Sequence, residues 1–137
     1  AALEALSRSL GLDAAVQFTG WVTEPAKTLD ACDVFVLPSL DEPFGIVLLE
    51  AMARGKAIIA TRTHGPLEIF DETAAWLVET GSAEQLARAL SQAAEHPAAL
   101  RQKSGAALAL FRQTYSSAAV IPRILEVYDR LSEPAPG

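Results

Sequence analysis

Apolar residues along this chain follow two alternating patterns, one typical of amphipathic helices and one typical of buried strands. Residues 1–10 carry apolar side chains at helical spacing, and Gly11 is a natural place for that helix to end. Strands are predicted at residues 15–20, 33–37, 56–63 and 74–80. Further helices are predicted within residues 21–32, 45–55, 64–72, 82–96, 97–115 and 116–133, with Ser82 as an N-cap.

The alternation of strands and helices predicts an α/β fold, a Rossmann-like doubly wound parallel sheet followed by C-terminal helices. Two of the strands, 33–37 and 56–63, contain unbroken apolar runs at 34–37 and 57–60, as expected for strands covered on both faces. Ligands of such sheets bind where the strands end at their carboxyl side. The loops expected to carry function are therefore 19–25, 38–45, 61–68 and 79–83.

The composition describes a folded, acidic, single domain. Half of the 137 residues are hydrophobic and the net charge is −6, which disfavours non-specific nucleic-acid binding. Cys32 is the one cysteine and is expected to pack as a small apolar residue, and with only His64 and His96 no metal site is expected. No apolar run approaches the roughly 20 residues that span a bilayer, so no membrane segment is expected. A cytoplasmic location follows as the default.

Familiar motifs for other chemistries are missing from the sequence. There is no glycine-rich dinucleotide fingerprint, no Walker A loop, no serine nucleophile elbow and no zinc-protease helix motif. Oxidoreductase, P-loop kinase, α/β-hydrolase and metalloprotease functions therefore lose support.

Two carboxylates, Glu42 and Glu50, stand eight residues apart in an otherwise apolar stretch. A helix that starts near Phe44 or Gly45 puts their α-carbons roughly 10–12 Å apart along its axis, which does not suggest a paired acid and base. The start of that helix favours a phosphate, and carboxylates accept hydrogen bonds from sugar hydroxyls. The pattern indicates a sugar nucleotide. The alternative is a first-turn acid at 42 and a solvated helix residue at 50, although the apolar neighbours of Glu50 favour a partner or a pocket.

The stretch "PSLDEPFGIVLLEAMARGKAIIAT" resembles the signature of the retaining glycosyltransferases of GT-B fold, the group 1 or GT4-like family with an E-x7-E motif. The stretches "VQFTGWV", "LDACDVFVLPS" and "THGPLEIFDETAAWLVETGSAEQLARAL" resemble its other segments, so the resemblance covers nearly the whole chain. It implies the donor-binding domain of an enzyme that transfers a hexose from a UDP- or GDP-linked sugar with retained configuration. No cofactor or metal is implied, because fixed cations and a helix end neutralise the leaving diphosphate.

The resemblance also implies roles for individual residues. Glu42 is the expected catalytic residue, holding donor-sugar hydroxyls near the anomeric centre. Backbone amides of Phe44, Gly45 and Ile46 are expected at the sugar or the distal phosphate, and Glu50 at the ribose hydroxyls. Two further residues are expected to frame the base through their backbone: Trp21 and Val22.

Three residues of the next loop are further candidates: His64 and Gly65 for contacts near the donor, and Glu68 for capping or bracing the loop. Relatives often have two glycines here, whereas this chain reads Thr63–His64–Gly65–Pro66, so only Gly65 keeps that freedom. Contacts near the donor phosphates are the function that this departure puts in doubt.

The resemblance further implies that this chain is part of a longer protein. We expect residues 1–132 to be a partial donor domain and residues 133–137 a disordered tail. An N-terminal domain would hold the acceptor, and a preceding strand and loop would carry an arginine and a lysine for the diphosphate. The fragment alone is then expected to be inactive, with a sheet edge prone to self-association. Peripheral membrane association of the parent stays open.

Two other functions remain as alternatives. A non-catalytic GT-B-like binding or interaction module is compatible with the altered glycine loop, though not suggested by the intact Glu42 and Glu50. Another GT-B enzyme, such as a sugar-nucleotide epimerase or a phosphorylase, is the second. A phosphorylase would need a lysine for pyridoxal phosphate, and Lys56 is not convincingly placed for it.

Overall fold

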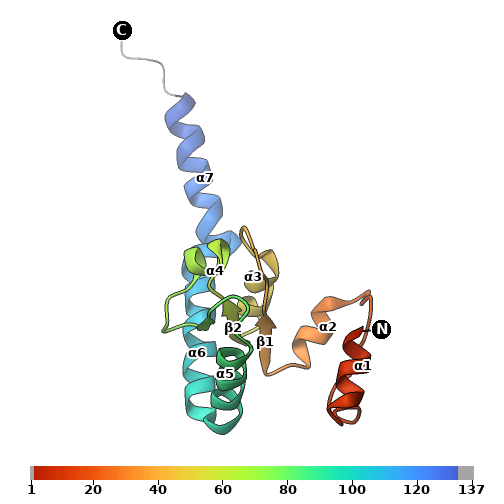
Figure 1. The fold of residues 1–137 in the computed structure, drawn as a ribbon. Coiled ribbons are helices and arrows are strands. Elements are labelled where there is room, and N and C mark those ends of the chain that lie inside the picture. The colour runs from red at the N-terminus through yellow and green to blue at the C-terminus, as the bar shows by residue number, and fades with distance from the viewer. Residues whose placement is uncertain (1, 133–137) are drawn as a thin grey trace.

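The computed structural model describes residues 2–132 of the chain, and the predicted tail at 133–137 lies outside the described residues (Figure 1). The elements in chain order are α1 (Ala2–Ser9), α2 (Pro25–Asp30), β1 (Val34–Leu37), α3 (Ile46–Ala53), β2 (Ala57–Thr61), α4 (His64–Ile69), β3 (Trp76–Val78), α5 (Ala83–Glu95), α6 (Pro97–Leu110), a π-helical turn (Phe111–Tyr115) and α7 (Ser117–Ser132).

The three described strands form one parallel sheet in the order β1-β2-β3. Val34 pairs with Ala57, and Ile59 pairs with Trp76, so the strands run in register along a short common length. Each connection passes through a helix, α3 and then α4, as parallel neighbours require. The predicted α/β fold with a parallel sheet is confirmed.

Helices cover both faces of the sheet and bury two apolar clusters. On one face Ile58 of β2 packs in a cluster with Leu48 and Met52 of α3, and the end of α6 joins this cluster. On the other face Ile59 and Trp76 pack in a cluster with residues of α5. The central strand β2 is therefore buried along its whole length, whereas β1 is half-buried throughout.

Helix boundaries follow the expected local chemistry. The Ser82 hydroxyl accepts a hydrogen bond from the Gln85 N–H and caps α5 as predicted. Pro25 and Pro97 stand in the first turns of α2 and α6, where a missing N–H costs nothing.

Residues 15–20 do not form the predicted strand; they run without regular structure from α1 toward α2. Val16 and Phe18 are 40% and 47% exposed. A strand needs a neighbour for its backbone N–H and C=O groups, and the described sheet is confined to β1, β2 and β3. Figure 1 shows the reason: α1 and this segment lie to one side of the body, beyond α2.

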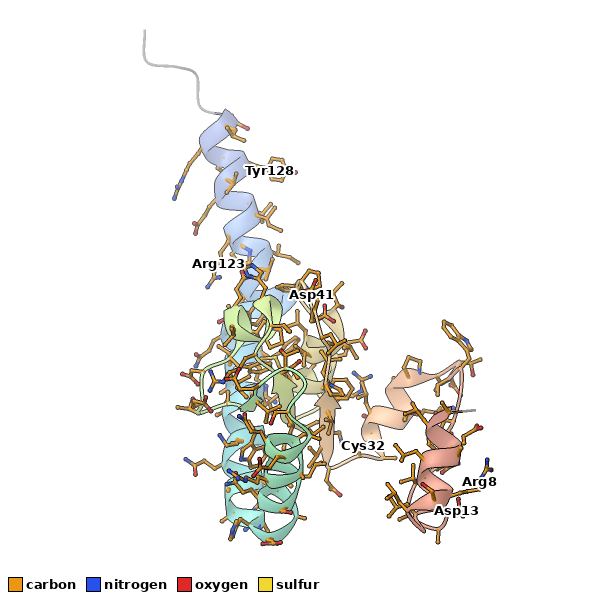
Figure 2. All side chains as sticks on the ribbon, viewed as in Figure 1. Arg8, Asp13, Cys32, Asp41, Arg123 and Tyr128 are labelled. Atoms are coloured by element: carbon orange, nitrogen blue, oxygen red, sulfur yellow. The ribbon has the colours of Figure 1, made fainter. Side chains whose placement is uncertain are left out.

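The last helix, α7, projects away from the body (Figure 1). None of its described residues is buried, and Figure 2 shows Arg123 and Tyr128 standing out from it. Among residues 2–132 no helix is both long and apolar enough to cross a membrane.

β1 is an edge strand, because it pairs only with β2 in the described sheet. Two apolar hollows, of ≈ 460 and ≈ 410 Å³, border it, and Val34 lines both. The self-association expected from such an edge stays a prediction.

Candidate functional site

The carboxyl ends of the three strands open onto one edge of the sheet. Pro38 follows β1, Arg62 follows β2 and Glu79 follows β3. The loop from 38 to 45 leads from β1 to α3, and Figure 2 shows its Asp41 at the end of the body from which α7 rises. Because parallel strands deliver their loops to the same edge, this is where the fold can assemble a ligand site.

α3 begins at this edge on a residue that has to be glycine. Gly45 is the N-cap, with φ 89° and ψ 61° in the left-handed region. The positive φ disfavours other residues, and a Cβ at Gly45 would lie 2.7 Å from Leu48 Cδ1, so the Leu48 side chain would have to shift as well. The helix start therefore has no side-chain cap. Its first N–H groups and the positive end of its dipole are available to an anion.

Glu42 lies beside that helix start. It is half-buried, and its Oε1 accepts a hydrogen bond of 3.4 Å from the Phe44 N–H. The carboxylate and the backbone amide that were both predicted to bind the sugar donor are thus adjacent. Phe44 and Ile46 have exposed side chains, 37% and 68%.

Glu50 lies in the second turn of α3 on a face open to solvent. The expectation that its carboxylate needs a partner or a pocket was wrong, because water can solvate it there. The geometry leaves it accessible to a ligand that extends along α3 from the helix start. The Arg54 guanidinium donates a hydrogen bond of 3.4 Å to the Glu50 carbonyl oxygen rather than to its carboxylate.

The two residues predicted to frame the base differ in their surroundings. Val22 lines the apolar hollow of ≈ 410 Å³ together with Val47 of α3 and residues of α2 and β1. Trp21 is 92% exposed, and does not line that hollow. The structure thus brings Val22, but not the Trp21 side chain, close to the helix that follows the candidate loop.

The three further candidates all belong to α4, which starts at His64, so only residues 62–63 of the loop predicted at 61–68 lie outside regular structure. His64 and Glu68 are exposed, with 3.9 Å between His64 Nε2 and Glu68 Oε2. Burial, with a smaller contribution from the Glu68 charge, raises the pKa of Tyr115. Gly65 is buried, and its N–H donates to the Glu42 carbonyl oxygen at 2.8 Å.

Side-chain cations near this edge are already engaged. Arg62 forms ion pairs with Glu72 and with Glu79, the latter at 3.3 Å between Nε and Oε1. Arg54 Nε instead pairs with the Asp30 carboxylate of α2 at 3.1 Å, and Lys56 Nζ donates to the Asp30 carbonyl oxygen at 3.0 Å. An anionic ligand at the start of α3 would therefore meet backbone N–H groups more readily than side-chain charge from this part of the chain.

A second hollow at the same edge was not anticipated. Its volume is ≈ 220 Å³, and it lies between the ends of all three strands and the start of α5. Thr61, Glu79 and Ser82 line it. Nearby in sequence, the Thr63 hydroxyl is buried and has no hydrogen-bond partner among the described residues. Between residues 2 and 132 no group of three or more His, Cys, Asp or Glu side chains is arranged to hold a metal ion.

Comparison with protein families matches residues 1–108 to the model described as glycosyl transferases group 1. The lipopolysaccharide core biosynthesis glycosyltransferase LpsD of Rhizobium meliloti is 36% identical over 129 residues, which is 93% of this chain and 38% of LpsD. The chain therefore spans well under half of this curated relative.

Solved structures show the same fold. HepE of Anabaena, crystallised with UDP, superposes with a TM-score of 0.87 at 26% identity, over 94% of this chain and 36% of HepE. The C-terminal domain of the group 1 glycosyl transferase LpcC of Francisella tularensis gives a TM-score of 0.79 at 30% identity, over 85% of this chain and 62% of that one. The sheet and its helices thus match GT-B glycosyltransferase structures.

Proposed function

The chain belongs to the glycosyl transferases group 1 family, and from that premise we propose that it is the donor-binding part of a retaining hexosyltransferase. Its ligand is a nucleotide-diphosphate sugar, linked to UDP or GDP. The acceptor is held by a separate N-terminal domain of a longer parent protein, which works in the cytoplasm.

One observation carries this proposal: an uncapped helix start lies beside Glu42, and Glu50 follows in the next turn. The N–H groups of Phe44, Gly45 and Ile46 bind the distal phosphate or the sugar. Glu42 accepts hydrogen bonds from the sugar hydroxyls and steadies the anomeric centre, whereas Glu50 accepts them from the ribose. The donor thus extends along the first two turns of α3.

The base lies beside α3 in this arrangement, on the side of the helix that faces Val22 and α2. Val22 borders the hollow next to Val47, and the backbone of Trp21 and Val22 frames one side of the base. HepE, whose structures contain UDP and UDP-glucose, supports a nucleotide sugar as the ligand.

Neutralisation of the diphosphate requires charge that residues 2–132 do not offer free at this edge. Arg62 is held by Glu72 and Glu79, so the helix start is the remaining positive end. We therefore assign the diphosphate cations to another part of the parent, and expect weak donor binding and no transfer by this chain alone. No metal takes part in the proposed reaction.

Calorimetric titration of the parent enzyme with UDP- and GDP-sugars tests the assignment. Glu50→Gln replaces a charged acceptor with a neutral amide oxygen and should weaken donor binding about five- to tenfold, from the difference of roughly 1–1.5 kcal/mol between charged and neutral hydrogen bonds. Glu42→Gln should mainly lower turnover. Glu126→Gln, an exposed carboxylate of α7, is the matched control and should leave both unchanged. If Glu42→Gln and Glu50→Gln behave like the control, the roles assigned here are wrong.

A non-catalytic binding module is the second candidate. The ion pairs that hold Arg62 away from the helix start favour it. A parent protein that binds a nucleotide sugar tightly but neither transfers nor hydrolyses the sugar would establish this alternative.

A further inference from the structure

Gly65 occupies a helical position where glycine is not required by the backbone angles. It lies inside α4, and it is not among the described glycines with positive φ. Glycine at such a position usually weakens a helix relative to alanine. The reason for glycine at 65 must therefore be space.

The space is set by the backbone of the loop before α3. A Cβ at Gly65 would lie 2.3 Å from the Phe44 carbonyl oxygen and 2.5 Å from both Phe44 C and Phe44 Cα. These distances are far below van der Waals contact, and the atoms met are main chain, which cannot rotate away. Phe44 C and O share one rigid peptide plane with the Gly45 N–H. The surface of Gly65 thus supports the peptide from which α3 starts.

Two hydrogen bonds also join these two segments, and both are accepted by residues that precede Phe44 in the loop. The Gly65 N–H donates to the Glu42 carbonyl oxygen at 2.8 Å. Thr61 Oγ1, at the end of β2, donates to the Ser39 carbonyl oxygen at 2.6 Å. Residues 61–65 therefore bind residues 39–44 through two hydrogen bonds. The contact between Gly65 and Phe44 lies beside the Gly65–Glu42 bond.

Gly65 itself is buried, as is its neighbour Pro66. Because Gly65 is buried, a sugar donor cannot reach it directly in this conformation. We propose that Gly65 is a positioning residue: it fixes the Glu42 backbone and the Phe44–Gly45 peptide, and through them the groups that meet the donor. This inference rests on the proposed function of α3, and it changes the role of Gly65 from ligand contact to support.

Amide NMR of the 137-residue chain, with UDP and UDP-glucose as probes, tests the proposal. In the unmodified chain the Gly65 amide should exchange with solvent at least a hundredfold more slowly than an exposed amide. Added UDP should shift the Phe44, Gly45 and Ile46 amides more than the Gly65 amide. Fast exchange of Gly65, or a larger shift of Gly65 than of the other three, would overturn the positioning role.

Gly65→Ala is the decisive variant, and Gly105→Ala is its matched control. Gly105 is also helical, but a Cβ there would meet nothing within 4 Å. We expect Gly65→Ala to displace the Phe44 and Gly45 amide signals while the β2 signals stay in place, and to weaken UDP binding at least tenfold. Gly105→Ala should leave the Phe44 and Gly45 amide signals in place. Its UDP affinity should stay within twofold of that of the unmodified chain. Unmoved loop signals in Gly65→Ala would contradict the proposal.

Thr61→Val covers the case in which Gly65→Ala does not fold. It keeps the side-chain shape and removes only the hydroxyl that grips the Ser39 carbonyl. The Ser39 to Glu42 amides should shift, and Gly65 should lose exchange protection several-fold; the absence of both changes would refute the coupling. A chain that binds neither UDP nor UDP-glucose would count against the proposed donor site, whereas the amide positions and exchange rates would still decide the role of Gly65.

Discussion

The packed body, residues 34–115, and the N-terminal arm, residues 2–24, contain segments of similar apolar character with opposite outcomes. In the body, β2 is a strand with every residue buried. In the arm, residues 15–20 also have strand-type side chains, yet they are exposed and irregular. The difference shows that a strand-type pattern becomes a strand only where a neighbouring strand and two covering helices satisfy its backbone and its side chains.

Hydrogen exchange should show the largest contrast between the two regions. Amides of Ile58 to Ala60 should exchange only through global unfolding, which for a typical domain of about 5–15 kcal/mol means protection of at least about a thousandfold. Amides of Gln17 and Phe18, in the irregular segment of the arm, should exchange nearly as free peptides. Comparable protection in both would show that the arm pairs with another strand in solution.

Core substitutions should give the next largest contrast. Ile58 is fully buried, so Ile58→Ala should cost about 2–5 kcal/mol of unfolding free energy in urea titrations. Phe18→Ala in the arm should cost less than about 0.5 kcal/mol, since its ring is 47% exposed. Equal costs would mean that Phe18 is buried against something in solution.

Helix-terminal serines sharpen the comparison at a smaller scale. Ser82→Ala removes the cap of α5 and should lower stability by about 1 kcal/mol. Ser9→Ala removes a hydroxyl that donates only to the exposed Leu6 carbonyl oxygen in α1. Thermal unfolding should show a lower Tm for Ser82→Ala, whereas the Tm of Ser9→Ala should be nearly unchanged.

The acid sensitivity of the body should show the smallest effect. Hydrogen bonds from the Thr73 hydroxyl and N–H lower the pKa of Asp71. A carboxyl with a lowered folded pKa stabilises the fold above its unfolded pKa, about 3.9, and loses this contribution as the pH falls through the folded value. Asp71→Asn should therefore make stability less dependent on pH in that range.

Thr73→Val provides a second view of the same turn, because it keeps the carboxyl and removes one donor. The pH dependence of its stability in acid should lie between that of the unmodified chain and that of Asp71→Asn. Acid unfolding can be monitored by circular dichroism. Identical acid-unfolding curves for all three proteins would rule out a contribution of this turn to stability.

Most helices and the strands β1 and β2 were predictable because their signals are local. The apolar runs that became β1 and β2, the Ser82 cap and the proline-led starts of α2 and α6 depend on neighbours in sequence. The start of α3 on Gly45 was also predicted to within a residue or two. The strand prediction for residues 15–20 failed for the reason that separates the two regions. The strand-type pattern is local, but a strand also needs a neighbouring strand, which local sequence does not supply.

The candidate site divides in the same way. Glu42, Gly45 and Glu50 could be selected from their spacing around a helix start. The solvation of Glu50, the ion pairs of Arg62 and the exposure of Trp21 depend on which elements pack nearby. The contact of Gly65 with Phe44 joins residues 21 positions apart, and no local pattern announces it.

The sequence alone determined which segments can be helices or strands, and which carboxylates flank a helix start, because those properties arise from side chains a few residues apart. The tertiary structure alone decided that residues 61–65 grip the loop of Glu42 and Phe44, and that the arm has no strand. Close approach of distant backbone and the pairing of strands depend on the packing of the whole sheet, which makes them properties of the fold.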